Sequence, residues 1–158
     1  MSMNMQRSGI GATEAHSQLL KESYKRWTGK ELVSSTVSDN KSLAEQLFQA
    51  PFVILSHGTE LDPVLNYGNE TALQLWEMDW DQLTSTPSRL TAEPMERDER
   101  DAFFEKVTAH GYVDDYTGIR VSSSGRRFYI LQAIVWNLID DEGIYRGQAA
   151  TFSEYRYI

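Results

Sequence analysis

The order of the predicted strands and helices constrains the fold more than any other feature of this sequence. Two short β-prone segments, 52–56 and 63–67, precede a block of helical segments, and three long β-prone segments then follow at 112–122, 127–139 and 144–155. Short turns rich in Gly, Asp and Ser separate the last three segments, which is typical of an antiparallel meander. Strands divided by a block of helices predict an α+β fold with a five-stranded antiparallel sheet and helices inserted between strands 2 and 3.

Local start and stop signals define the helices. The predicted N-caps are Thr13, Ser42, Asn69 and Asp79. Ser42 is followed at the third position by Glu45, which predicts a capping box. A longer helix is expected to begin at Pro94 and to end before Gly111, because Pro favours the first helical position and Gly the position after the last turn.

The strand predicted at 127–139 has apolar residues on both faces. One alternating set is Phe128, Ile130, Ile134 and Trp136. The other set is Tyr129, Leu131, Ala133 and Val135. The central helices can cover only one face of the sheet, so a second helical layer is needed on the other face.

An amphipathic helix before the first strand can supply that layer. Leu20, Tyr24 and Trp27 recur at positions i, i+4 and i+7 before Gly29. We expect this helix, from the same protomer or from a partner, to cover part of the second sheet face. Because a partner can supply it, the three apolar residues are candidate contacts of a homodimer.

Length and charge narrow the class of protein. A chain of 158 residues predicts one compact domain with a sizeable core. The 23 acidic and 15 basic side chains give a formal net charge of −8. This is the wrong sign for a protein that binds phosphate backbones or anionic lipids by charge. We therefore expect neither nucleic acid nor a membrane as a partner.

Cysteine is absent from the sequence, which excludes disulfides, thiolate metal sites, cysteine nucleophiles and cysteinyl flavin adducts. A non-covalently bound flavin is still compatible with the sequence. No apolar run approaches the roughly 18 to 20 residues of a membrane span, and the N-terminus lacks the apolar region of a secretory signal. We predict a cytoplasmic protein with a disordered lead-in over 1–12, a helical extension over 13–50 and the main domain over 51–158.

Several local motifs resemble a PAS domain, the cup-shaped sensor fold. The stretch PVLNYGNETALQLW at 63–76 resembles the PAS segment in which a strand leads through an Asn-containing turn into a helix. The stretch 118–128 resembles the hairpin between the third and fourth PAS strands. Together with the element order, these motifs imply a PAS-like sheet preceded by the N-terminal helix.

Four further motifs resemble the MEKHLA domain, a PAS-related family. They are APFVILSHG at 50–58, PSRLTAEP at 87–94, DDYTGIR at 114–120 and GQAATF at 147–152. The resemblance extends over about 19–155. It implies a module found alone in bacteria and at the C-terminus of plant class III homeodomain leucine-zipper proteins, with a role in sensing or regulated dimerisation.

The candidate cavity residues are large or polar side chains in the strands and helices of the predicted cup. They are His57, Tyr67, Trp76, Phe103, Phe104, Arg120, Gln132, Trp136 and Gln148. Ligand pockets combine mostly apolar walls with a few polar groups, although core packing alone also explains the aromatic residues. Gln132 and Gln148 are expected to be buried, where each must pair internally or face a ligand.

The sequence allows two roles for Arg120 and two for His57. Arg120 interrupts an apolar strand and can clamp a carboxylate, or it can pair with Asp114 or Asp115. His57 lacks nearby metal-ligand partners in the sequence, so we interpret it as a hydrogen-bonded structural residue. Haem is therefore disfavoured and no metal site is predicted.

No catalytic motif is evident. Asp114 and Asp115 are adjacent in a strand and point to opposite faces unless a bulge intervenes. We predict a non-enzymatic PAS-like sensory and signalling module that binds a small metabolite or a partner protein and forms a homodimer. The alternative is a small enzyme that uses Asp115, His57 or Tyr67 as acid or base in an apolar pocket.

Overall fold

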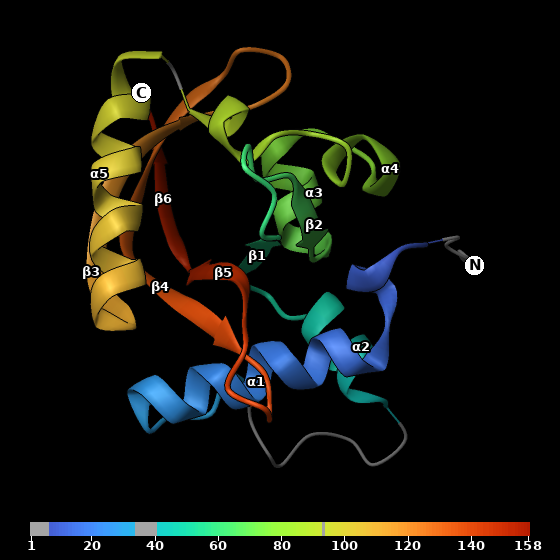
Figure 1. Cartoon of the computed structure of the whole chain (residues 1–158). Coiled ribbons are helices and arrows are strands. Elements are labelled where there is room, and N and C mark those ends of the chain that lie inside the picture. Colours follow the sequence, from blue (N-terminus) through green and yellow to red (C-terminus); the bar gives the residue numbers. More distant parts are fainter. Residues whose placement is uncertain (1–6, 34–40, 93) are drawn as a thin grey trace.

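The strands form one antiparallel sheet. A computed structural model of the chain describes residues 7–33, 41–92 and 94–158, without the side chains of 94–97, 100 and 104. The strands are β1 (Val53–His57), β2 (Leu65–Gly68), β3 (Tyr112–Val121), β4 (Arg127–Ile139), β5 (Tyr145–Phe152) and β6 (Glu154–Tyr157). Their order is β2-β1-β5-β4-β3, and β6 continues beyond β5 to pair with β4. The predicted five-stranded order is confirmed, with the last predicted strand divided into β5 and β6 (Figure 1).

The helices begin where the sequence predicts. The α-helices are α1 (Glu14–Thr28), α2 (Leu43–Phe48), α3 (Glu70–Trp76), α4 (Trp80–Leu83) and α5 (Pro94–His110), and short 3-10 turns are η1 (Ile10–Ala12) and η2 (Ser88–Thr91). The side chains of Thr13, Ser42, Asn69 and Asp79 each cap a helix, and Ser42 forms the capping box with Glu45. Among the described helices, none has the length and apolarity to cross a membrane.

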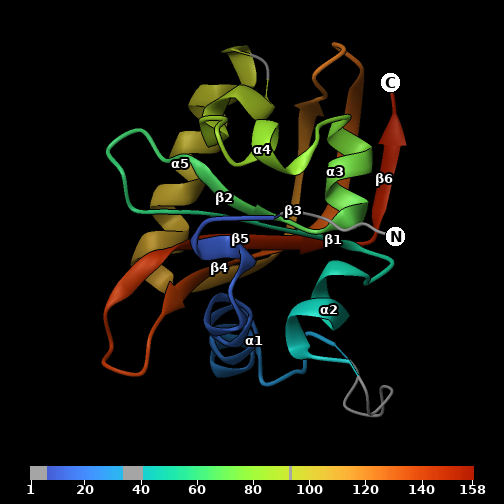
Figure 2. The same ribbon diagram turned by 90° about the vertical axis from the view of Figure 1, so that its right-hand side faces the viewer.

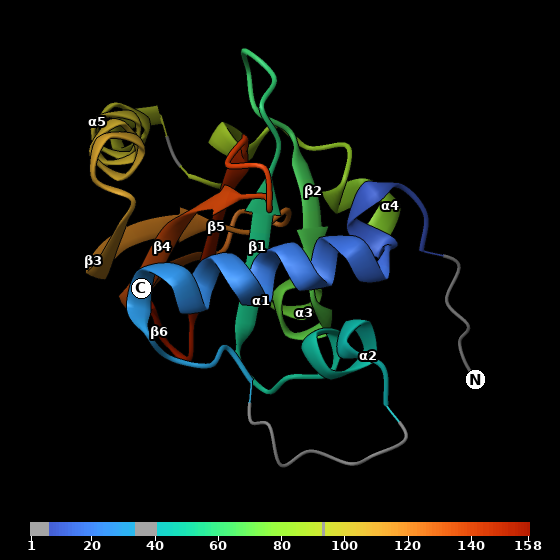
Figure 3. The same ribbon diagram turned by 60° about the horizontal axis from the view of Figure 1, so that its bottom comes forward.

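Helices lie on both sides of the sheet. Figure 2 shows α3 and α4 on one side and α1 and α2 on the other, and Figure 3 shows α1 crossing the strands. We call the side facing α3 the inner face and the side facing α1 the outer face. Helix α5 contacts β3 and β4. The second helical layer is therefore supplied by the same protomer.

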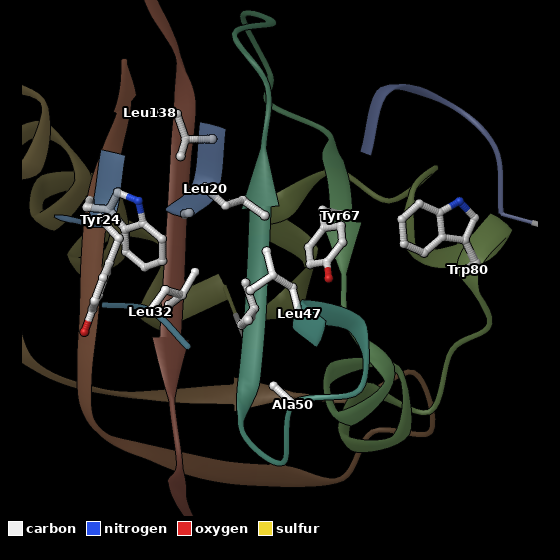
Figure 4. Close-up of a cluster of buried hydrophobic side chains, with 11 residues drawn as sticks. Leu20, Tyr24, Leu32, Leu47, Ala50, Tyr67, Trp80 and Leu138 are labelled. Atoms are coloured by element: carbon white, nitrogen blue, oxygen red, sulfur yellow. The ribbon is translucent and has the colours of Figure 1, made fainter. Parts of the chain in front are cut away.

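The outer face is closed by a large apolar cluster. Leu20 and Tyr24 of α1 pack with Leu47 of α2 and with Trp136 and Leu138 of β4. Leu20 and Leu47 are fully buried, and the Tyr24 and Trp136 rings meet edge to face with centroids 4.9 Å apart. Figure 4 shows this cluster spread across β4, β1 and β2. The N-terminal extension is thus part of the main core.

Strand β4 changes face at Gln132, which the alternation in the sequence did not predict. Gln132 has a φ of 53°, and the ladder with β3 shifts register between Tyr116 and Gly118. An irregularity of this kind exchanges the faces of all residues beyond it. Phe128 and Ile130 consequently share the inner face with Ala133, whereas Trp136 lies on the outer face.

Two predictions about this strand are therefore wrong. Phe128 and Ile130 do not share a face with Trp136, and Gln132 is exposed instead of buried.

A third correction concerns the predicted disordered lead-in. Residues 10–12 form η1, and Gly11 packs so closely on the Asn66 carbonyl that a β-carbon at Gly11 would lie 1.7 Å from the oxygen. Residues 1–6 and 34–40 lie outside the described part of the chain.

The position of Leu20 in the core predicts the effect of truncating its side chain. Leu20→Ala should lower the free energy of unfolding by about 2 to 5 kcal/mol, because it removes a fully buried side chain and leaves a cavity. Urea denaturation measures the change. Gln18→Ala, an exposed position in the same helix, should change stability by no more than about 0.5 kcal/mol. Equal losses for the two variants would contradict the placement of α1 on the sheet.

Candidate functional site

A small cavity lies on the inner face of the sheet. Its volume is about 50 Å³. The apolar and aromatic lining residues are Leu55, Leu65, Trp76, Tyr116, Ile130, Val135, Ala149, Ala150 and Phe152, and the polar ones are Ser56, His57, Ser88, Thr91, Arg120 and Gln148. Pockets for drug-sized ligands span roughly 300 to 1,000 Å³. The cavity therefore fits a small metabolite and is too small for a flavin or haem.

Arg120 is the cationic residue of this lining. Its side chain is 5% exposed, and its Nη1 and Nη2 groups donate to the Ile119 carbonyl and to Tyr116 Oη, both at 2.8 Å. Asp114 and Asp115 are exposed, even though a register shift follows Val113. No carboxylate among the described residues forms an ion pair with Arg120. The predicted pairing with Asp114 or Asp115 is therefore wrong.

Gln148 joins the cavity to the C-terminal part of α5. Its Nε2 donates to Thr108 Oγ1 at 3.0 Å and to Asn137 Oδ1 at 3.1 Å, and Asn137 Nδ2 in turn donates to the Val107 carbonyl at 3.0 Å. Both amide side chains are buried. Gln148 is thus a buried amide with internal partners that also lines the cavity.

The same network reaches the outer layer. Trp27 Nε1 of α1 donates to the backbone carbonyl of Asn137 at 2.9 Å. The backbone N–H of Asn137 donates to the Gly111 carbonyl, also at 2.9 Å. Gly111 has a φ of 101°, and a β-carbon there would lie 2.6 Å from the Trp27 ring. Only glycine therefore allows α5 to end against Trp27.

His57 and Trp76 lie on the cavity wall. His57 Nδ1 is 2.9 Å from the Gly58 carbonyl, which requires a proton on Nδ1. Across the described ranges, no group of three or more His, Cys, Asp or Glu residues could hold a metal ion. Trp76 packs edge to face on Phe128 and Phe152, and its buried Nε1 has no hydrogen-bond partner among the residues that the structure describes.

Four of the other candidate residues are not part of the cavity lining. Tyr67 and Trp136 are buried in the outer cluster, and Gln132 is exposed. Phe103 packs on Tyr116 with ring centroids 4.0 Å apart, and the Phe104 side chain lies outside the described part. Of the predicted residues whose side chains the structure describes, His57, Trp76, Arg120 and Gln148 lie together at the cavity.

Sequence reasoning missed Tyr116, Ser88 and Thr91. Tyr116 lies four residues before Arg120 on the same strand. Because side chains in a strand alternate between the two faces, this spacing predicts that both lie on the same face of the sheet. Ser88 and Thr91 belong to η2, and no sequence period places a single 3-10 turn over a cavity. Arg89 of the same turn points elsewhere and pairs with Asp62 at 3.1 Å.

A second buried polar group lies on the outer side of β1. His16 Nε2 is 2.9 Å from Ser56 Oγ, and the Ser56 hydroxyl donates to Asn66 Oδ1 at 2.5 Å. The single hydroxyl hydrogen of Ser56 is thereby used, so His16 Nε2 must be the donor and cannot act as a base toward Ser56. Burial lowers the pKa of His16 from 6.5 to about 4.

The strand order and the inserted helices define a PAS-like domain. The structure matches the PAS domain of a protein from Colwellia psychrerythraea with a TM-score of 0.61, at 13% identity, over 73% of this chain and 92% of that chain. It also matches an RNA-binding Light-Oxygen-Voltage receptor with a TM-score of 0.62, at 15% identity, over 79% of this chain and 36% of that one. At such identities the likeness shows the fold alone.

Residues 14–157 match the MEKHLA domain, so the chain belongs to the MEKHLA domain family. Homeobox-leucine zipper protein ATHB-14 of Arabidopsis thaliana is 29% identical over 126 residues, 78% of this chain and 15% of that protein. ATHB-15 of the same plant is 23% identical over 138 residues, 86% of this chain and 16% of that protein. The chain therefore spans a small part of the length of these relatives.

The low pKa of His16 predicts an acid-dependent loss of stability. The unfolded chain takes up a proton at His16 near pH 6.5 and the folded chain only near pH 4. The contribution of neutral His16 is therefore complete above about pH 6.5 and falls by up to about 3 kcal/mol as the pH drops to about 4. As the pH is lowered from about 6.5 to about 4, the urea midpoint should fall less steeply in His16→Gln than in the native chain. Gln18→Ala, at an exposed and non-titrating position of the same helix, should keep the native slope, and parallel profiles for all three proteins would contradict the prediction.

Proposed function

We propose that this MEKHLA domain is a non-enzymatic sensory module that binds a small molecule in the inner cavity. The observation that carries the proposal is the meeting of Arg120, Gln148 and His57 at one cavity with apolar walls. His57 and Gln148 are paired within the protein, whereas Arg120 has only neutral acceptors among the described residues, and a buried charge costs free energy unless it is paired. Apolar walls with a few convergent polar groups are typical of a ligand site.

The hydrogen bonds around Asn137 support a route from the cavity to the rest of the domain. Gln148 touches the cavity, and Asn137 connects it to α5 and, through Trp27, to α1. A ligand that shifts Gln148 changes interactions in both helical layers. We expect the output to be a change in binding to a partner protein.

The acid/base alternative has no converging set of residues in the described part of the chain. Tyr67 lies in the outer cluster, where burial raises its pKa, and Asp115 is exposed on β3. His57 alone of the three lines the cavity. General acid/base catalysis requires its groups within hydrogen-bond reach of one substrate, so the sensory role is favoured.

Homodimerisation and a cytoplasmic location stay predictions. Leu20 and Tyr24 are buried within one protomer and Trp27 is partly buried, so the uncovered sheet face that motivated the dimer is absent from the described structure. A dimer that keeps this core must use other surface residues. Light scattering of the intact chain measures its mass and decides the question.

The proposal predicts that cavity-filling abolishes small-molecule binding. Ala150→Leu adds three carbon atoms to the cavity wall, whereas Ala109→Leu makes the same change at an exposed position of α5. A library of small acids, amides, alcohols and amines, tested by amide chemical-shift perturbation, should contain compounds that shift cavity resonances. These shifts should disappear in Ala150→Leu and persist in Ala109→Leu. A library without any such compound, or binding that survives Ala150→Leu, would count against the proposed function.

A further inference from the structure

Among the residues whose side chains the structure describes, no carboxylate balances the charge of Arg120. Arg120 is 5% exposed, and both of its hydrogen-bond acceptors, the Ile119 carbonyl and Tyr116 Oη, are neutral groups. The described residues of the cavity lining include no Asp or Glu. Buried charges in proteins are normally paired, because removing an unpaired charge from water is costly. An unpaired guanidinium at a cavity therefore points to an anion as the missing partner.

We propose that the ligand of the inner cavity is a small carboxylate with two or three carbon atoms, held by Arg120 and Tyr116. This inference rests on the proposed function and adds the charge and the size of the ligand. A carboxylate is favoured because guanidinium and carboxylate form charge-assisted hydrogen bonds of matching planar geometry.

Both residues retain donors for such a ligand. Arg120 uses two of the five N–H groups of a guanidinium on the protein. Tyr116 Oη accepts from Arg120, which leaves the hydroxyl hydrogen available to donate. Trp76 also contributes to the lining, and its buried Nε1–H has no acceptor among the described residues. Arg120 and Tyr116 thus offer donors to a ligand, without a competing carboxylate in the described part of the lining.

The cavity volume limits the rest of the ligand. A cavity needs about 10 to 15 Å³ to hold one water molecule, so about 50 Å³ holds roughly three to five water-sized groups. A carboxylate with one or two further carbon atoms has four or five non-hydrogen atoms and is compatible with this space, and an aromatic ring is not. The short carbon chain would lie against apolar lining residues such as Ile130 and Phe152.

The inference is tested by comparing acids with their amides on the intact chain. Acetate and propionate are titrated against acetamide and propionamide at pH 7.5, followed by amide chemical shifts, with ionic strength matched by sodium chloride. The acids should bind about tenfold more tightly, which is about 1.4 kcal/mol, because hydrogen bonds to charged groups are stronger than those to neutral groups. Benzoate should not shift the cavity resonances.

Matched variants locate the interaction. Arg120→Gln should abolish the preference for acids, and Tyr116→Phe should weaken acid binding several-fold. Arg126→Gln should change neither the preference for acids nor the affinity for them, because Arg126 is exposed and lies over the Tyr157 ring. If Arg120→Gln does not fold, Arg120→Lys takes its place, and the loss of the planar fork should reduce the preference for acids.

Three results would overturn the inference. The amides could bind as tightly as the acids, or the preference for acids could persist in Arg120→Gln. Chloride or inorganic phosphate could also shift the cavity resonances as much as the acids do. If other library compounds still bind in the cavity, the sensory proposal stands and only the carboxylate assignment fails. If no compound binds there, both fail.

Discussion

Strand β4 is buried on both of its faces, and the rest of the domain is arranged around this constraint. Phe128 and Ile130 pack under α3, whereas Trp136 and Leu138 pack under α1. A single layer of helices would leave one of these sets in water, at roughly 1.5 to 3 kcal/mol for each large side chain. The N-terminal helix is therefore a structural requirement of the sheet. The exchange of faces at Gln132 allows one strand to serve both layers.

Asn137 shows how the two layers are joined without leaving polar groups unpaired. It lies in the buried part of β4, and its backbone and side chain contact Trp27, Gln148 and the end of α5. A buried donor or acceptor that loses its partner costs about 1 to 3 kcal/mol. Each of the three elements is consequently held in position by the other two. The inner cavity lies beside this junction, so its shape depends on the relative placement of α1, α5 and β5.

Features encoded over a few residues were predictable, and features that depend on distant partners were not. The caps at Thr13, Ser42, Asn69 and Asp79 are confirmed, because a cap is decided by the residues that follow it. The turn of Gln132 into the left-handed region depends on the register of β3 and β4, which alternation alone does not fix. The same limit applies to the cavity. Arg120 was identified as a candidate, but only the structure shows that Asp114 and Asp115 are exposed and that no described carboxylate pairs with it.

The acidic surface and the cationic cavity act on an anion at different ranges. At physiological salt, surface charges are screened beyond about 8 Å, so the net charge of −8 mainly affects how often an anion approaches. Inside the cavity, two unit charges 4 Å apart interact by about 4 kcal/mol at an effective dielectric constant of 20, against about 1 kcal/mol in water. Arg120 therefore decides whether a carboxylate remains bound once it has entered. A low on-rate combined with retention by a buried cation is what distinguishes a selective site from a general affinity for anions.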